Sequence, residues 1–138
     1  MATFTKFNSF VEALAEQLHN LGSDQLKIAL TAAANVPVAT NTILANLTQI
    51  SYTYCSTRNL TISTSAQTSG TYKLVLEDLT LTASGGVVGP FRYVVIYNDT
   101  AGNDELIGFY DYGSEVTLAD GESLTINFDG TNGVLTLA

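Results

Sequence analysis

The sequence has few of the side chains with which proteins carry out covalent chemistry or bind metal ions. Its 138 residues include one cysteine, one histidine and no tryptophan. Because Cys55 stands alone, no disulfide can form within the chain, and neither neighbour is a base that could activate the thiol. With His19 as the only histidine, there is neither a nucleophile–histidine–acid set nor a cysteine and histidine cluster for zinc. We therefore expect a protein that is not an enzyme and that has no cofactor and no metal.

Positive charge is scarce as well. Five lysine and arginine residues stand against thirteen aspartate and glutamate residues, which gives a net charge of −8. No basic residue follows Arg92, and eight of the thirteen acidic residues lie between Asp99 and Asp129. Such a chain lacks the basic face that neutralises nucleic-acid phosphates, and it is a poor match for an anionic membrane. We predict that the acidic stretch faces either solvent or a basic patch on a partner protein.

Long apolar runs are missing too. No window approaches the run of about 18 apolar residues that a membrane-spanning helix needs. The start, MATFTKFNSF, lacks the basic region and the apolar core of a signal peptide, so we expect folding in a reducing cytoplasm. Charged residues make up 13% of the chain, against about 25% in an ordinary soluble domain. This surface suits either a protein whose faces are covered by neighbours or an ordinary β-domain.

The first pattern present in the chain is helical. Apolar residues recur at spacings of three and four, namely Phe4, Phe7, Val11, Leu14 and Leu18. This predicts an amphipathic helix over residues 4–20, capped by Thr3 and ended by Gly22. The segment 1–22 then either packs on one side of the domain that follows or docks into a neighbouring subunit.

From Leu26 onward the apolar period becomes alternating, which is typical of strands. Residues 23–138 therefore predict an antiparallel β-sandwich, jelly-roll-like or immunoglobulin-like, and the whole chain 1–138 is expected to be a single, mainly β domain. A short helix near 41–47 is left open, and 63–71 is expected to be a loop or an edge. The predicted strands are Leu26–Thr31, one around Leu60–Ile62, Tyr72–Leu76, Phe91–Tyr97, Leu106–Tyr112, Glu115–Leu118, Leu124–Phe128 and Val134–Leu137.

Two irregularities refine this plan. The apolar phase changes within residues 72–83, which predicts a bulge or break at Glu77–Asp78. A turn of odd length would pair Leu118 with Leu124; otherwise the two strands belong to different sheets. The strand Phe91–Tyr97 is apolar on both faces and suits a central position. The predicted core consists of Phe91, Tyr93, Val95, Leu124, Ile126 and Phe128.

One loop has the composition of a cation site. Residues 98–104, NDTAGND, supply oxygen ligands and a glycine, as calcium loops do. The spacing does not match an EF-hand, so we predict a tight turn between two strands and keep calcium as the alternative. Paired carboxylates elsewhere lie in predicted surface turns, where no apolar pocket would raise a pKa for acid catalysis.

Tyrosine is plentiful, with seven residues in the chain. It is favoured at protein interfaces because one end of the side chain is apolar and the other polar, although it is equally common on strands. Aromatic residues therefore supply the candidate interface, which comprises Phe4, Phe7, Tyr52, Tyr54, Tyr110 and Tyr112.

Several segments in this order resemble small structural proteins of tailed bacteriophages. They are the helical FNSFVEALAEQLHNL, LKIALT at 26–31, GPFRYVVIYND at 89–99, LIGFYDYGS at 106–114 and LADGESLTINFDGTNGVLTLA at 118–138. The resemblance covers most of the chain and implies a helix-plus-sandwich virion protein without catalytic residues.

The resemblance further implies a capsid decoration or cement protein, which binds the major capsid protein and stabilises the head. Its partners would be the major capsid protein or other virion proteins. It would form a homo-oligomer, in a virion assembled in the cytoplasm of the bacterial host, without nucleic acid or membrane as partners. The alternatives are a tail or neck component, and a receptor- or carbohydrate-binding module.

Overall fold

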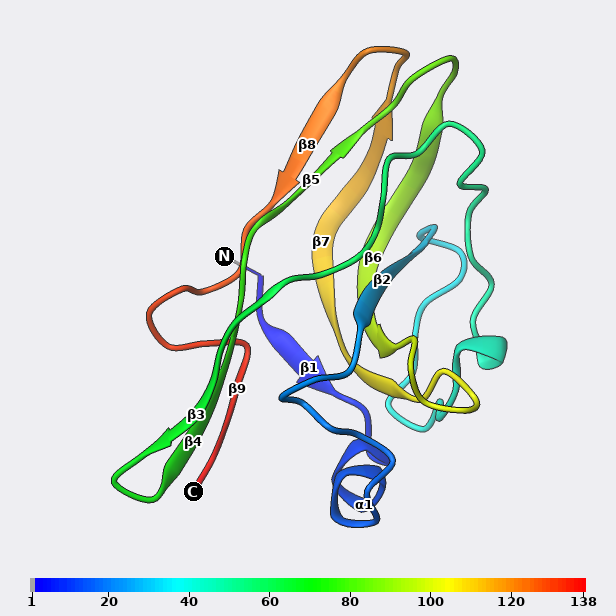
Figure 1. Ribbon diagram of the computed structural model, residues 1–138. Helices are drawn as coiled ribbons and strands as arrows, with labels where there is room; N and C mark the ends of the chain where they lie inside the picture. Colours follow the sequence, from blue (N-terminus) through cyan, green and yellow to red (C-terminus); the bar gives the residue numbers. More distant parts are fainter. Residues whose placement is uncertain (1) are drawn as a thin grey trace.

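The computed structural model describes residues 2–138 and is built mainly of β-strands (Figure 1). Every pair of neighbouring strands is antiparallel, so the predicted mainly β fold with one helix near the N-terminus is confirmed. In chain order the elements are β1 (Phe4–Lys6), α1 (Phe10–Ala15), β2 (Leu26–Thr31), the 3-10 turn η1 (Leu44–Asn46), β3 (Ile62–Thr68), β4 (Thr71–Leu76), β5 (Leu79–Thr82), β6 (Val88–Asn98), β7 (Leu106–Leu118), β8 (Ser123–Ile126) and β9 (Leu135–Leu137).

The first layer is a four-stranded sheet in the order β1-β7-β6-β2. Its central strand β6 is buried on both faces, as predicted from its apolar residues. Val94 and Ile96 belong to the main core, whereas Val95 and Tyr97 belong to a smaller cluster with Phe7 on the other face. A strand enclosed in this way has no solvent-facing side, and this explains its near-continuous apolar sequence.

The second layer consists of β3-β4-β9 and of β5-β8. The predicted break at Glu77–Asp78 is confirmed, because β4 ends at Leu76 and the chain continues as β5 in the other small sheet. Asp78 fixes this corner, since its carboxylate accepts a hydrogen bond of 2.8 Å from the backbone N–H of Phe128. Of the two alternatives for the strands around Asp120, the structure shows separate sheets, since β7 pairs with β6 and β8 pairs with β5, and Leu118 does not pair with Leu124.

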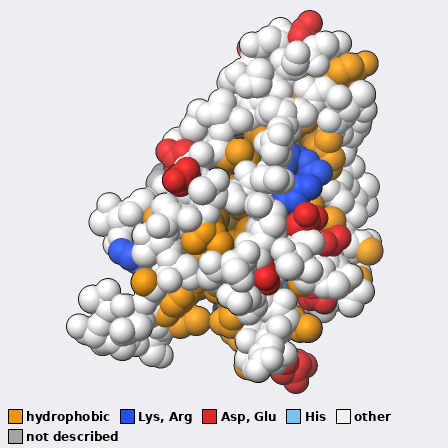
Figure 2. Space-filling view, viewed as in Figure 1, with side chains coloured by type: hydrophobic (Ala, Val, Ile, Leu, Met, Phe, Trp, Pro, Cys, Tyr) orange, Lys and Arg blue, Asp and Glu red, His pale blue; other side chains and the backbone are white. Residues whose placement is uncertain are grey.

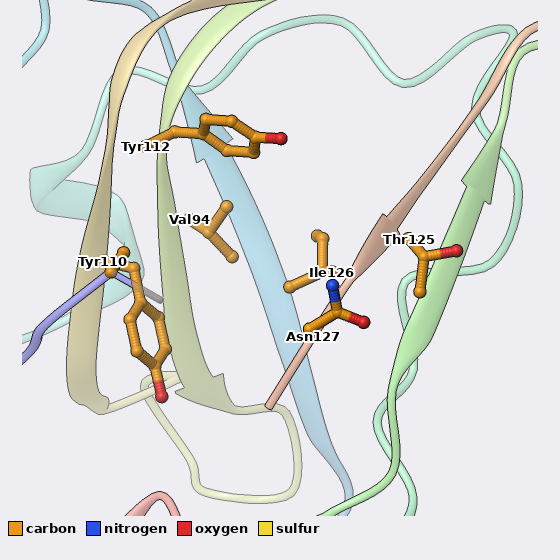
Figure 3. Close-up of a pocket in the computed structure, with 7 residues that line it drawn as sticks. Val94, Tyr110, Tyr112, Thr125, Ile126 and Asn127 are labelled. Carbon is orange, nitrogen blue, oxygen red and sulfur yellow. The ribbon is translucent and has the colours of Figure 1, made fainter. Parts of the chain in front are cut away.

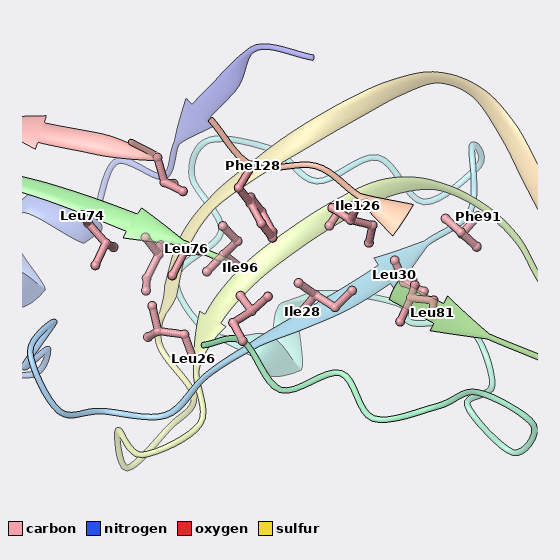
Figure 4. Close-up of a cluster of buried hydrophobic side chains, with 14 of the residues drawn as sticks. Leu26, Ile28, Leu30, Leu74, Leu76, Leu81, Phe91, Ile96, Ile126 and Phe128 are labelled. Carbon is pink, nitrogen blue, oxygen red and sulfur yellow. The ribbon is translucent and has the colours of Figure 1, made fainter. Parts of the chain in front are cut away.

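The main core lies between the two layers (Figure 4). Of the six predicted core residues, five are buried and Leu124 is partly exposed. Phe91 and Val95 do not share one face, however, since Phe91 belongs to the main core and Val95 to the smaller cluster with Phe7, and the register between β6 and β7 shifts between Phe91 and Tyr93. Phe91 pairs with Val116 and Tyr93 pairs with Asp111, so the residues between 111 and 116 bulge outward. The same bulge joins into one strand, β7, what the sequence predicts as two.

The predicted helix over residues 4–20 is wrong at both ends. Residues 4–6 form β1, and α1 has only six residues, after which the chain turns at Gln17 with a φ of 67°. The edge strand is possible because Phe4 lies against Gly108 of β7, where any larger side chain would collide with the Phe4 ring. The apolar residues that the sequence places at a helical spacing therefore belong to a short strand followed by a short helix, not to one helix.

The short helix does pack on the sandwich. Phe10 is 1% exposed and joins the main core, and Ala13 is buried beside it, whereas Val11 and Leu18 are about half exposed. The second possible helix, near 41–47, is the single turn η1. Residues 63–71, expected to be a loop or an edge, form most of the edge strand β3 and its turn into β4.

The two sides of the sandwich differ. On the closed side, the segment 55–60 joins both layers: Asn59 pairs with Lys27 of β2, and Cys55 pairs with Ala83 just after β5. On the open side, β1 pairs with β7 only at residues 108–110, and no strand of the described residues joins β7 of the first layer to β8 of the second (Figure 1). The candidate functional site lies on the open side.

Candidate functional site

A cleft of about 400 Å³ lies on the open side (Figure 3). We call it the tyrosine cleft. The close-up shows Tyr110 and Tyr112 reaching from β7, Val94 on β6 behind them, and Thr125 to Asn127 across the gap. Its lining residues are Ala2, Val94, Tyr110, Tyr112, Thr125, Ile126 and Asn127.

The floor of the cleft is apolar and firm. Val94 is 3% exposed and Ile126 is 8% exposed, and both belong to the main core. Thr125 and Asn127 flank Ile126 and are exposed, because alternate residues of a strand point to opposite sides. An occupant would therefore meet hydrocarbon at the floor and polar groups at the rim.

The two tyrosines of the cleft play different parts. The Tyr110 ring is wedged between Phe4 and Phe128, with ring centres 5.5 Å and 6.1 Å away, so it forms a fixed wall. Burial, together with the nearby Asp129 carboxylate, raises the pKa of Tyr110 to about 12, so the phenol stays neutral. Tyr112 is 47% exposed and offers its ring to solvent.

The strands that border the cleft have unpaired edges. β1 pairs with β7 only at residues 108–110, and no other strand within residues 2–138 pairs with the rest of that edge. β8 is bonded to β5 on one side, and within the described chain no strand bonds to its other side. Exposed strand edges offer backbone N–H and C=O groups to which another chain can bind.

The charge around the cleft is negative but mostly committed to local structure. Asp120 accepts a hydrogen bond from the N–H of Gly85, and Asp129 accepts two from the turn that follows it. Asp111 forms an ion pair of 2.8 Å with Arg92, and the hydrogen bond from that guanidinium lowers the pKa of the Asp111 carboxyl. Of the eight acidic residues in this stretch, five are exposed, Asp104 and Asp129 are partly buried, and Glu105 is 8% exposed.

The six predicted interface residues have different environments. Tyr110 and Tyr112 meet in the cleft, and Phe4 supports Tyr110 from behind. Phe7 is 0% exposed and has no surface to offer a partner. Tyr52 lies on the closed side, where its hydroxyl oxygen accepts a hydrogen bond from the backbone N–H of Leu30.

Tyr54 is the remaining member of the predicted set. It is 45% exposed, and its ring covers Gly85 and Gly86 at the turn between β5 and β6. The sequence therefore identified the two tyrosines of the cleft but not the residues opposite them. Thr125 belongs to another sheet and Asn127 follows it, and the apolar periodicity of the sequence does not predict that they lie near Tyr112.

The loop over residues 98–104 connects β6 to β7, as predicted for a turn. Asn98 is fully buried, and its side-chain oxygen accepts hydrogen bonds from the N–H groups of Thr100 and Ala101. Its side-chain amide donates to Asp24 and to Nδ1 of His19. The oxygen that a cation would need from Asn98 is therefore used by the turn. Within residues 2–138, no three His, Cys, Asp or Glu side chains are grouped as a metal site.

The single histidine, His19, and the single cysteine, Cys55, both have pKa values shifted by burial. Burial lowers the pKa of His19, against the pull of the Glu105 and Asp24 carboxylates, and its ring lies 5.4 Å from that of Phe10. Burial raises the pKa of the Cys55 thiol, with Arg58 opposing. Both shifts favour the neutral side chain.

No protein-family model, curated protein or solved structure matches this chain. Within residues 2–138, no helix has the length and apolar character needed to cross a membrane. The likeness to phage virion proteins stays a prediction from the sequence.

Proposed function

We propose that this protein is a non-enzymatic structural protein of a tailed-phage virion, and that it decorates the capsid by binding the major capsid protein. The single observation that carries a binding role is the open side of the sandwich. There, two unpaired strand edges border an apolar floor and an exposed tyrosine, Tyr112. The virion as its place of action comes from the resemblance of the sequence alone.

The composition of the surface supports a role in assembly. Charged residues are few, and Figure 2 shows a displayed face covered mostly by uncharged groups, with hydrophobic side chains visible among them. A specific protein interface buries at least about 1,000 Å² in total, which is more than a cleft of this size provides. We therefore propose that the tyrosine cleft anchors a wider contact with the capsid. We also propose that the protein forms a homo-oligomer closed by twofold or threefold symmetry.

One observation favours a second candidate, a carbohydrate-binding module. Such a module presents an aromatic ring beside polar groups in a groove, and Tyr112 with the exposed amide of Asn127 has this character. The two candidates differ in what they bind at the same place. Binding of oligosaccharides that is lost in Tyr112→Ala, with no attachment to capsids, would favour the module.

Quantitative mass spectrometry of purified virions tests the main proposal. We expect a copy number close to that of the major capsid protein, and capsids stripped of the protein should rebind it in solution. A copy number that is a small fraction of this would place the protein in the tail or neck. Absence from washed particles, together with a monomeric protein in analytical ultracentrifugation, would contradict the structural role.

A further inference from the structure

We propose that the tyrosine cleft takes an extended segment of a different, basic protein, which completes the open side of the sandwich as an added β-strand. The segment would carry apolar side chains at alternate positions and lysine or arginine at its ends. This inference rests on the proposed function, since it names the kind of partner segment through which attachment would occur.

The closed side of the same molecule shows what such a segment does. There, residues 55–60 run along the edge of β2, with Leu60 donating its N–H to Leu26 and Ile28 donating its N–H to Arg58. The same short segment also bonds to β5, because the N–H of Ser56 donates to Thr82. An extended chain can thus tie the two layers together along one side. On the open side, β1 occupies only residues 108–110 of the β7 edge, and no strand of the described residues bonds to the outer edge of β8.

The side chains of the open side fit an extended occupant. Successive residues of a strand point to opposite sides, so every second side chain of the occupant would face the Val94 and Ile126 floor. The residues between would face solvent, as Thr125 and Asn127 do on β8. Tyr112 lies beside the free edge with its ring half exposed, where it can pack on the occupant and exclude water from its hydrogen bonds.

Charge favours a different, basic protein over a second copy of this chain. The segment from Asp99 to the C-terminus, which supplies both walls of the cleft, contains eight acidic and no basic residues. Asp111, between the lining residues Tyr110 and Tyr112, forms an ion pair with Arg92. Asp129, which acts on Tyr110, is bonded by the backbone and amide groups of its own turn. A second copy would bring the same excess of negative charge, whereas lysine or arginine on the occupant would be attracted.

The test uses the intact protein and a synthetic peptide of about seven residues, the length of an ordinary strand. The peptide alternates valine and threonine between terminal lysines and is blocked at both ends. A glutamate-ended peptide of the same core is the charge control, and a peptide with N-methylated amides is the hydrogen-bond control. We expect the lysine peptide alone to bind, with slowed amide hydrogen exchange confined to β8 and the 111–117 part of β7.

Two variants localise the binding, and a third is the matched control. Tyr112→Ala should weaken binding of the lysine peptide about tenfold, as expected for loss of an aromatic contact of about 1.4 kcal/mol. Asn127→Lys should weaken it as well and improve binding of the glutamate peptide. Tyr54→Ala removes a tyrosine of nearly equal exposure outside the cleft and should change neither. Circular dichroism spectra confirm that each variant is folded.

The outcomes separate this inference from the proposed function. If no peptide binds, or if the N-methylated peptide binds as well as its parent, the added-strand inference is wrong. Attachment to capsids that still depends on Tyr112 would leave the proposed function standing in that case. If the glutamate peptide binds equally well, the basic partner is wrong. Peptide binding without any presence in virions would sink the proposed function and keep the inference.

Discussion

The closed and open sides of the sandwich join the same two layers, but only one of them is fastened by the chain itself. On the closed side, Arg58 lies 3.6 Å from the centre of the Tyr52 ring and donates a hydrogen bond of 2.6 Å to the carbonyl of Ile28. On the open side, Tyr110 packs on Phe4 and Phe128 below, and Tyr112 above them is half exposed.

The two sides differ in how much of their backbone edge and aromatic surface is already bonded within the chain. On the closed side, residues 55–60 bond to the edges of β2 and β5, and Arg58 packs on the Tyr52 ring, so these edges already have a partner within the chain. On the open side the aromatic residues are present, but the strand that would cover them is missing from the described chain. On this side, the packing below the cleft must then hold the two layers together without a bridging segment.

The largest effect is expected under the cleft, at Phe128. The side chain is 5% exposed and belongs to the main core, so Phe128→Ala should reduce the free energy of unfolding by about 3–5 kcal/mol. Urea denaturation followed by circular dichroism measures this loss, and Phe128→Leu should lose much less. A loss below about 1 kcal/mol for the alanine variant would mean that the open side is not held by its core.

A smaller loss of stability is expected when the contacts of Arg58 on the closed side are removed. Arg58→Ala removes the ring contact with Tyr52 and the charged hydrogen bond to Ile28, which together stabilise the fold by about 1–3 kcal/mol. Arg58→Lys should recover only part of this, because an ammonium group does not stack as a planar guanidinium does.

Arg92→Ala is the matched control for Arg58, since it removes the exposed ion pair with Asp111. Surface ion pairs contribute little, so the variant should unfold almost as the parent does. Equal losses at Arg58 and Arg92 would contradict the view that the closed side is a structural fastening.

The free energy of unfolding is expected to depend on pH through His19. Because Asn98 uses its oxygen for the turn, its amide must donate to Nδ1 of His19, and a proton on that nitrogen would break the bond. The folded-state pKa is lowered below the ordinary 6.5, mainly by burial, so the unfolded state binds the proton more readily. Stability from this group is complete above pH 6.5 and is lost as the pH falls below that value.

Thermal unfolding at neutral and mildly acid pH checks this sign. The free energy of unfolding should fall by no more than about 1.4 kcal/mol per pH unit on acidification, as one proton allows. In His19→Gln, whose side-chain oxygen can accept from Asn98, this part of the pH dependence should disappear. A variant that keeps the full acid sensitivity of the parent would show that other groups cause it.

The sequence predicts a strand well where the prediction needs no knowledge of the neighbouring strands. Phe91–Tyr97 is apolar on both faces, and only a central strand accommodates that. The change of phase around Glu77–Asp78 forced a break, because a strand cannot slip by one residue and keep its apolar face. These arguments use local spacing alone, and both predictions are confirmed.

The errors lie where distant residues decide. Phe4 fits a helical face by spacing, but its place is set by Gly108, more than a hundred residues later in the chain. The bond between His19 and Asn98 joins residues 79 positions apart and makes a lone histidine part of a buried polar network. For the same reason the sequence could name Tyr110 and Tyr112 as candidates, but not the cleft that they form with β8.

The smallest effect on stability is expected at Tyr112 itself. Its ring is 47% exposed, so Tyr112→Ala should change the free energy of unfolding by no more than about 0.5 kcal/mol. Urea denaturation of this variant beside Tyr54→Ala, which removes a ring that covers two glycines, gives the comparison. If Tyr112 is kept for a partner, its loss should leave unfolding unchanged and still reduce attachment to capsids. A large loss of stability at Tyr112 would make the open side a structural seam like the closed one, and the contrast between the two sides would fail.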